Sequence, residues 1–144
     1  RMIYLGVPDI KATEVQIKAS GGAILAPRFE VPGVVILCLF TDPAGTRIDV
    51  MLAETSFDET AIGRARAVEL QPGPAVRLCS AEDLIVYKIV SLRTQDRVDV
   101  EGIIRRQGDR LDDQYVEDWL RQFEQALDDS TLIGEYQRLR RQLT

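Results

Sequence analysis

The most informative part of the chain is Ser80-Ala-Glu-Asp-Leu-Ile-Val-Tyr-Lys88, which is followed by Arg93, Asp96 and Asp99. Ser80, with an acidic residue three positions on, predicts a capped helix start, and Lys88 then falls inside the apolar run of that helix. A lysine on an amphipathic helix can keep its ammonium group in water. It can also present a compact positive charge to a triphosphate. The spacing leaves both interpretations of Lys88 open.

The acids that follow Lys88 have a local and a longer-range interpretation. Asp96 and Asp99 can stand at a helix N-terminus, where the helix dipole favours them, or pair with neighbouring arginines. On an unbroken helix Lys88 and Asp99 would share a face but stand about 16 Å apart. They can meet only if the helix breaks, and the residues Thr94 and Gln95 predict a break there.

An antiparallel hairpin is predicted earlier in the chain. The run from Val34 to Thr41 is rich in β-branched residues and indicates a strand. Residues 42–45, Asp-Pro-Ala-Gly, have the chemistry of a tight turn. The run from Thr46 to Leu52 is then the returning strand.

Asp49 lies inside this returning strand, between apolar neighbours. An unpaired acid is costly to bury, so Asp49 either faces solvent, pairs with Arg47, or serves as a metal-binding carboxylate on a central strand. Spacing alone favours the solvent-exposed or paired alternatives.

The order of segments, strands first and helices last, predicts an α+β fold. We expect a small mixed β-sheet with the hairpin at its centre, followed by a C-terminal helical bundle. Residues 1–111 are predicted to form the α+β domain and residues 112–144 a helical extension packed on it. Several charged residues at helix ends are expected to be caps or a solvated face: Asp109, Asp112, Asp113, Asp128, Asp129, Arg138, Arg140 and Arg141.

Composition excludes several classes of function. The 144 residues contain no histidine, which removes Ser-His-Asp and Cys-His catalysis and most zinc sites. A net charge of −5 argues against bulk attraction to nucleic acid or anionic membranes. The longest apolar run, Val34 to Phe40, is far shorter than the ~20 residues of a membrane span, and no signal peptide is evident. We therefore expect a cytoplasmic protein without membrane association, with Cys38 and Cys79 as buried free thiols.

The succession of hairpin, Ser-Phe-Asp helix and Ser-Ala-Glu-Asp-Leu-Ile-Val-Tyr-Lys helix resembles the AbiEii-type nucleotidyltransferase-like proteins. These belong to the DNA polymerase β-like nucleotidyltransferase superfamily and often serve as toxins of bacterial toxin–antitoxin systems. The resemblance covers roughly Phe29 to Leu111. It implies a sheet of nucleotidyltransferase type and Mg²⁺-dependent transfer of a nucleotidyl group from an NTP to RNA or protein. An antitoxin protein is the partner that it implies.

The resemblance also assigns residues. Asp49 matches the third acid of the family pattern, which makes it the implied catalytic residue and Mg²⁺ ligand. Lys88 matches the lysine of the Glu-Asp-Leu helix, which implies a catalytic contact with the NTP phosphates. Arg93, Asp96 and Asp99 match the residues that follow it at the NTP site. Two-metal phosphoryl chemistry needs several carboxylates around the ions and a cation on the phosphates.

One family motif is missing from the chain. The family begins with a Gly-Ser turn and an Asp-x-Asp pair, and the sequence contains no Asp-x-Asp. One carboxylate is a poor site for Mg²⁺ and an NTP. The start at Arg1 indicates an N-terminally incomplete domain whose first motif lies upstream. The alternatives are a catalytically inactive module that acts through protein binding, and a structural domain of a larger protein.

Overall fold

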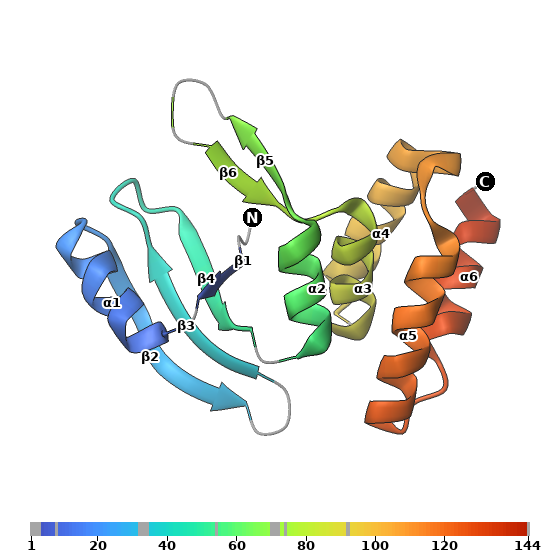
Figure 1. The fold of residues 1–144 in the computed structure, drawn as a ribbon, viewed down its shortest axis with the longest axis horizontal. Helices are drawn as coiled ribbons and strands as arrows, with labels where there is room; N and C mark the ends of the chain where they lie inside the picture. The colour runs from blue at the N-terminus through green and yellow to red at the C-terminus, as the bar shows by residue number, and fades with distance from the viewer. Residues whose placement is uncertain are drawn as a thin grey trace. The chain divides into compact units, whose positions relative to one another are not determined.

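The structure, a computed structural model, describes residues 4–7, 9–31, 35–53, 55–69, 73, 75–91 and 93–143. Within these ranges residues 4–6, 31, 35, 49, 51 and 52 are described by their backbone alone. Helices and strands are mixed in an α+β fold, as predicted (Figure 1). The chain divides into two compact units, Arg1–Ile62 and Gly63–Thr144. The boundary predicted between residues 111 and 112 falls inside the second unit.

A four-stranded mixed sheet forms the centre of the first unit. Its strand order is β1-β4-β3-β2, with β1 parallel to β4 and the other neighbours antiparallel. The strands are β1 (Tyr4–Val7), β2 (Ala23–Val31), β3 (Val35–Thr41) and β4 (Arg47–Leu52). The predicted hairpin is confirmed as β3 and β4, although Val34 lies outside the described residues.

The hairpin turn is built by its own polar groups. The Thr46 N–H donates to the Asp42 carboxylate at 2.8 Å, and the Asp42 N–H donates to the Thr46 carbonyl at 3.0 Å. Gly45 has a φ of 84°, in the left-handed region that glycine adopts without steric cost. These local contacts explain why the turn could be predicted from four residues.

Helix α1 (Ile10–Ala19) packs on the sheet and closes its core (Figure 1). Asp9 caps the helix, since its carboxylate accepts from the Ala12 N–H at 3.0 Å. The buried side chains of this core come from α1, β3 and β4: Ile10, Ile17, Cys38, Phe40 and Val50. Alternate residues of each strand therefore supply one buried face, as the period of a half-buried strand requires.

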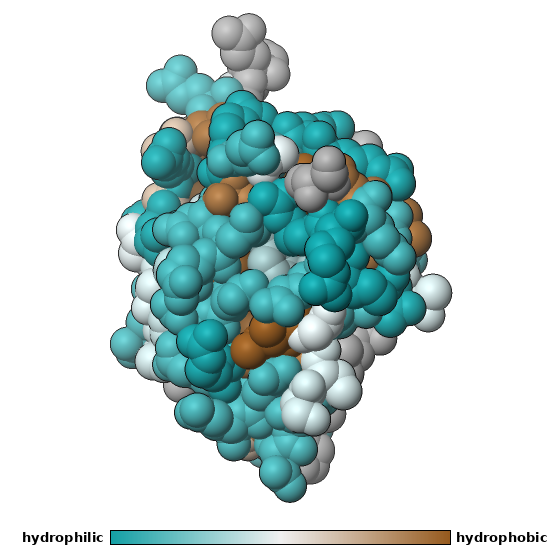
Figure 2. Space-filling view, turned by 90° about the vertical axis from the view of Figure 1, so that its right-hand side faces the viewer, coloured by the Kyte–Doolittle hydropathy of each residue, from teal (hydrophilic) through white to brown (hydrophobic). Residues whose placement is uncertain are grey.

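The second unit pairs a β-ribbon with four packed helices. The ribbon is β5 (Arg66–Glu69) and β6 (Ala75–Leu78), and the helices are α3 (Ala81–Ser91), α4 (Thr94–Gln107), α5 (Asp113–Leu127) and α6 (Leu132–Leu143), with a 3₁₀ turn at Gly108–Arg110. Fully buried apolar side chains from all four helices form the core: Ile85, Val86, Val100, Ile104, Val116, Leu120, Leu132 and Leu139. Figure 2 shows a largely hydrophilic face with small hydrophobic areas on the side of α5 and α6.

Two local expectations were wrong. Ser56, with Glu59 three residues on, has a capping-box pattern that predicts it as the cap of helix α2 (Ser56–Arg64). The cap is instead Thr55, because its hydroxyl accepts from the Asp58 N–H at 3.1 Å and donates to the Asp58 carboxylate at 2.7 Å. Cys38 is buried as predicted, but Cys79 is exposed. Cys79 directly follows β6, a strand whose residues are mostly exposed.

Candidate functional site

The start of α3 is fixed by a reciprocal cap, as the sequence predicted. The Ser80 hydroxyl accepts from the Asp83 N–H at 3.1 Å and donates to the Asp83 carboxylate at 2.8 Å. Asp83 is fully buried and also accepts from the Tyr115 hydroxyl at 2.6 Å and from Arg64 Nε at 3.3 Å. Three donors compensate the charge of this buried carboxylate, so α3 is anchored to α5 and to the end of α2.

A helix break at the other end of α3 brings Lys88 to the acids that follow it. Helix α3 ends at Ser91 and α4 begins at Thr94, so the interruption falls just before Thr94 and Gln95, near which the sequence predicted it. Lys88 Nζ lies 2.9 Å from an oxygen of Asp96 and 2.7 Å from an oxygen of Asp99. The reversal of the chain thus replaces the separation of about 16 Å on a straight helix with direct ion pairs.

Asp96 is the anchor of this cluster. Its side chain is 6% exposed. Besides Lys88, it accepts from the Ser91 hydroxyl at 2.5 Å and from Arg93 Nε at 2.7 Å. Burial alone would raise the pKa of the Asp96 carboxyl, but the hydrogen bonds from Ser91, Lys88 and Arg93 outweigh it and hold the pKa below its ordinary value.

The pKa of Lys88 is shifted in the opposite direction, above its ordinary value. Burial alone would lower the pKa of its ammonium group, but the hydrogen bonds to Asp99 and Asp96 raise the pKa above its ordinary value. Asp99 is the more accessible partner, with 48% of its side chain exposed. The ammonium group is therefore charged at neutral pH and held between a buried and an exposed carboxylate.

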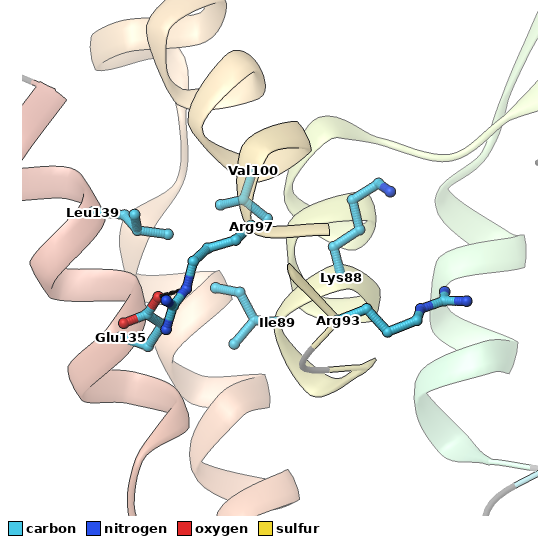
Figure 3. A pocket seen from close by; sticks show the side chains of 7 residues that line it. All are labelled: Lys88, Ile89, Arg93, Arg97, Val100, Glu135 and Leu139. Atoms are coloured by element: carbon cyan, nitrogen blue, oxygen red, sulfur yellow. Dashed lines mark ion pairs between the residues drawn. The ribbon is translucent and has the colours of Figure 1, made fainter. Parts of the chain in front are cut away.

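A small pocket adjoins the cluster between α3, α4 and α6. Its volume is about 40 Å³, and it is lined by Lys88, Ile89, Arg93, Arg97, Val100, Glu135 and Leu139. Figure 3 shows the Arg97–Glu135 ion pair on one side, with Lys88 and Arg93 extending away from it. Ligand pockets usually measure about 300–1,000 Å³, so this cavity by itself is too small for a nucleotide.

Asp49 belongs to the other unit. It lies on β4, with Leu39 of β3 and Tyr4 of β1 as its backbone partners in the sheet. Its carboxylate lies outside what the structure describes. Of the residues that the sequence singled out, the structure brings together Lys88, Arg93, Asp96 and Asp99.

The described residues do not by themselves fit a magnesium site. Within the described ranges, no three acidic or cysteine side chains come close enough to hold a metal ion. Asp96 directs one oxygen at Lys88 and the other at Ser91 and Arg93. In this arrangement both oxygens of Asp96 are occupied by donors of the protein rather than directed at a metal ion.

Three features of this region were not foreseen from the sequence. Ser91 completes the shell of Asp96, and its place beside the predicted break was the only indication of it. Asp113 and Arg140, expected to be a cap and a solvated cation, form a two-point ion pair between α5 and α6 at 2.8 Å, and Tyr136 also donates to Asp113. Asp112, in contrast, caps α5 as expected, since its carboxylate accepts from the Tyr115 N–H at 3.0 Å.

The family resemblance rests on the sequence motif of Ser80 to Lys88 and the residues that follow it. No protein-family model and no curated protein matches the sequence. Among the described residues, no helix combines the length and apolar character that crossing a membrane requires.

Proposed function

We propose that this chain is a nucleotidyltransferase-like domain that uses an NTP, in the setting of a toxin–antitoxin pair. The observation that carries the proposal is the meeting of Lys88 with Asp96 and Asp99 across the α3–α4 break. The motif that resembles the AbiEii-type proteins consists of these residues and the Ser80–Asp83 cap that fixes the start of α3. The residues of the motif thus form two sets of ionic and hydrogen-bonded groups, one at each end of α3.

Lys88 is the residue through which this cluster would meet a phosphate. Its side chain is 18% exposed, and its ammonium group keeps its charge at neutral pH. A phosphate oxygen that reaches it would replace Asp99, because that carboxylate is half exposed whereas Asp96 is buried. Asp96 would then hold the lysine stem in position, as a buried hydrogen-bonded partner does.

The rest of the proposed site follows from the resemblance. Asp49 on β4 would be the acid that binds Mg²⁺, which supplies charge neutralisation and orientation to phosphoryl transfer. The acceptor would be RNA or protein. The proposal requires an Asp-x-Asp pair from outside the printed sequence, so its test uses the full-length gene product.

The test is transfer of label from a radioactive NTP to RNA or protein by the full-length protein. We expect transfer by the wild type and at least about a hundredfold less with Asp49→Asn or Lys88→Met. Arg141→Gln, an exposed arginine on α6, is the control and should transfer at the wild-type rate. Unchanged transfer by both site variants would show that the residues are wrongly assigned. Thermal unfolding of Lys88→Met shows whether a loss of transfer results from a loss of folded structure.

A second candidate function has its own supporting observation. The β5–β6 ribbon exposes Val68 and Leu78, which are 38% and 50% accessible, on one face. A catalytically inactive module acting through protein binding would use such a surface. That module would bind no NTP in calorimetry and would form a stable complex in pull-down, and Val68→Ser with Leu78→Ser would abolish the complex. NTP binding in the micromolar range would remove this alternative.

A further inference from the structure

A larger pocket opens at the start of α3. Its volume is about 440 Å³, within the usual range of small-molecule sites. It is lined by Arg64, Arg66, Ser80, Ala81, Glu82 and Gln107, all in the second unit. Lys88 lies about 10 Å further along the helix axis, so this pocket is separate from the cluster around Lys88.

The acids beside this pocket are compensated by groups of the protein. Asp83 accepts from Tyr115, Ser80 and Arg64. Glu82 accepts from the Asp112 N–H at 3.4 Å, at the start of α5, and lies 3.8 Å from Arg64. Their negative charges are therefore directed at α5 and Arg64.

Arg64 is held in a fixed orientation. Its Nε donates to Asp83, and its guanidinium group lies over the Tyr115 ring, with 4.1 Å between the central carbon and the ring centroid. The side chain is still 40% exposed. A planar guanidinium group fixed in this way loses little conformational freedom when it binds an anion.

Two other side chains that line the pocket, those of Arg66 and Gln107, have donors that can bind a ligand. Arg66 begins β5 and Gln107 ends α4. Within the part of the chain that the structure describes, neither side chain has a hydrogen bond or ion pair. Arg64 is paired with Asp83 and Glu82, whereas Arg66 has no carboxylate partner among the described residues, so the charge of Arg66 is available to an anionic ligand.

We propose that this pocket binds a phosphate monoester, carried by a small molecule or by the end of a nucleic acid strand. Arginine matches the oxygens of a phosphate with two parallel donors, and Arg66 and Arg64 provide two such groups. The Gln107 amide adds a neutral donor. The backbone at Ala81 and Glu82 adds the N–H groups of the first turn of α3. The site does not depend on the nucleotidyl transfer proposed above.

The test is a ¹⁵N NMR titration of the full chain at constant ionic strength. Three probes are compared: inorganic phosphate, adenosine 5′-monophosphate and a 5′-phosphorylated tetranucleotide. We expect saturable shifts of the backbone amides of Ala81, Glu82 and Gln107. Tighter binding of the monophosphate would identify a small-molecule source, and tighter binding of the tetranucleotide would identify a strand end.

Variants locate the binding and make the proposal refutable. Arg66→Gln should weaken phosphate binding at least about tenfold, since a charge-assisted hydrogen bond is lost, and Gln107→Leu should weaken it less. Arg141→Gln, an exposed arginine that does not line the pocket, should bind as the wild type does. The proposal is overturned if no probe shifts these amides at millimolar concentration. It is equally overturned if Arg66→Gln and Arg141→Gln have the same effect, because that result indicates diffuse electrostatic attraction.

Discussion

Replacing Asp96 with alanine should destabilise the second unit much more than replacing Asp99, although both carboxylates bind the same ammonium group. The distances from Lys88 Nζ are similar, 2.9 Å to Asp96 and 2.7 Å to Asp99. The side chains differ in exposure, at 6% and 48%. The two variants therefore differ in the burial of the carboxylate that is removed and in the further donors, Ser91 and Arg93, that only Asp96 accepts from.

The expected loss in the free energy of unfolding depends on which groups each substitution leaves without a partner. Breaking a buried ion pair by removing one partner costs about 3–5 kcal/mol. Asp96→Ala leaves Lys88 with Asp99 but also removes the acceptor of Ser91 and Arg93, so we expect a loss of about 2–4 kcal/mol. Asp99→Ala removes an exposed partner and should cost about 0–1 kcal/mol.

Urea unfolding followed by the fluorescence of Trp119 measures both losses. Trp119 is the single tryptophan and lies on α5, in the same unit as the cluster. The dependence of the free energy of unfolding on urea should stay unchanged, so that the shift in midpoint reports stability. Equal losses for the two variants, or a larger loss for Asp99→Ala, would refute the assignment of Asp96 as the buried anchor.

The effect of Asp96 should also depend on pH. The pKa of Asp96 is lower in the folded protein than its ordinary value, because hydrogen bonds from Ser91, Lys88 and Arg93 outweigh burial. Its contribution is therefore complete above the unfolded-state pKa of about 3.9 and disappears as pH falls through the lower folded-state pKa. The difference in stability between wild type and Asp96→Ala should be constant near neutral pH and shrink below about pH 4.

Four further substitutions, two of them compared as a pair, test other parts of the structure. Tyr115→Phe should lower the free energy of unfolding by about 1–3 kcal/mol in urea titrations, because it removes the hydroxyl 2.6 Å from the buried Asp83 carboxylate. Arg140→Met should cost about 1–2 kcal/mol by the same assay, since it breaks the two-point pair with Asp113. Gly22→Ala should lower the midpoint of thermal unfolding, measured by circular dichroism, more than Gly45→Ala does. The Cβ added at Gly22 would lie 2.6 Å from the Thr41 carbonyl oxygen, whereas the Cβ added at Gly45 would touch nothing and cost only the strain of a positive φ.

Short-range chemistry could be predicted from the sequence. The turn at residues 42–45 and the Ser80–Asp83 cap are each complete within a few residues, and both were found where they were predicted. The helix break was also found, because Lys88 and the acids after it form a satisfied cluster only when the chain reverses between Ser91 and Thr94. The cap of α2 was misplaced by one position, because Thr55 and Ser56 are adjacent and chemically alike.

Contacts between distant segments could not be predicted. Tyr115 and Asp83 are 32 residues apart, and Arg140 and Asp113 are 27 apart. A single sequence shows only that each residue suits a helix end or a helix face. Such pairs depend on how α3, α5 and α6 pack. The same holds for the pocket at the start of α3, whose lining comes from α2, β5, α3 and α4.

The most direct test of the proposed nucleotidyltransferase-like function is calorimetric titration of the full-length protein with each NTP in the presence of Mg²⁺. We expect binding in the micromolar range by the wild type, and binding at least about tenfold weaker by Asp49→Asn and by Lys88→Met. If the folded wild-type protein gives no heat of binding with any NTP, the proposed function is wrong, and a module that acts through protein binding is favoured.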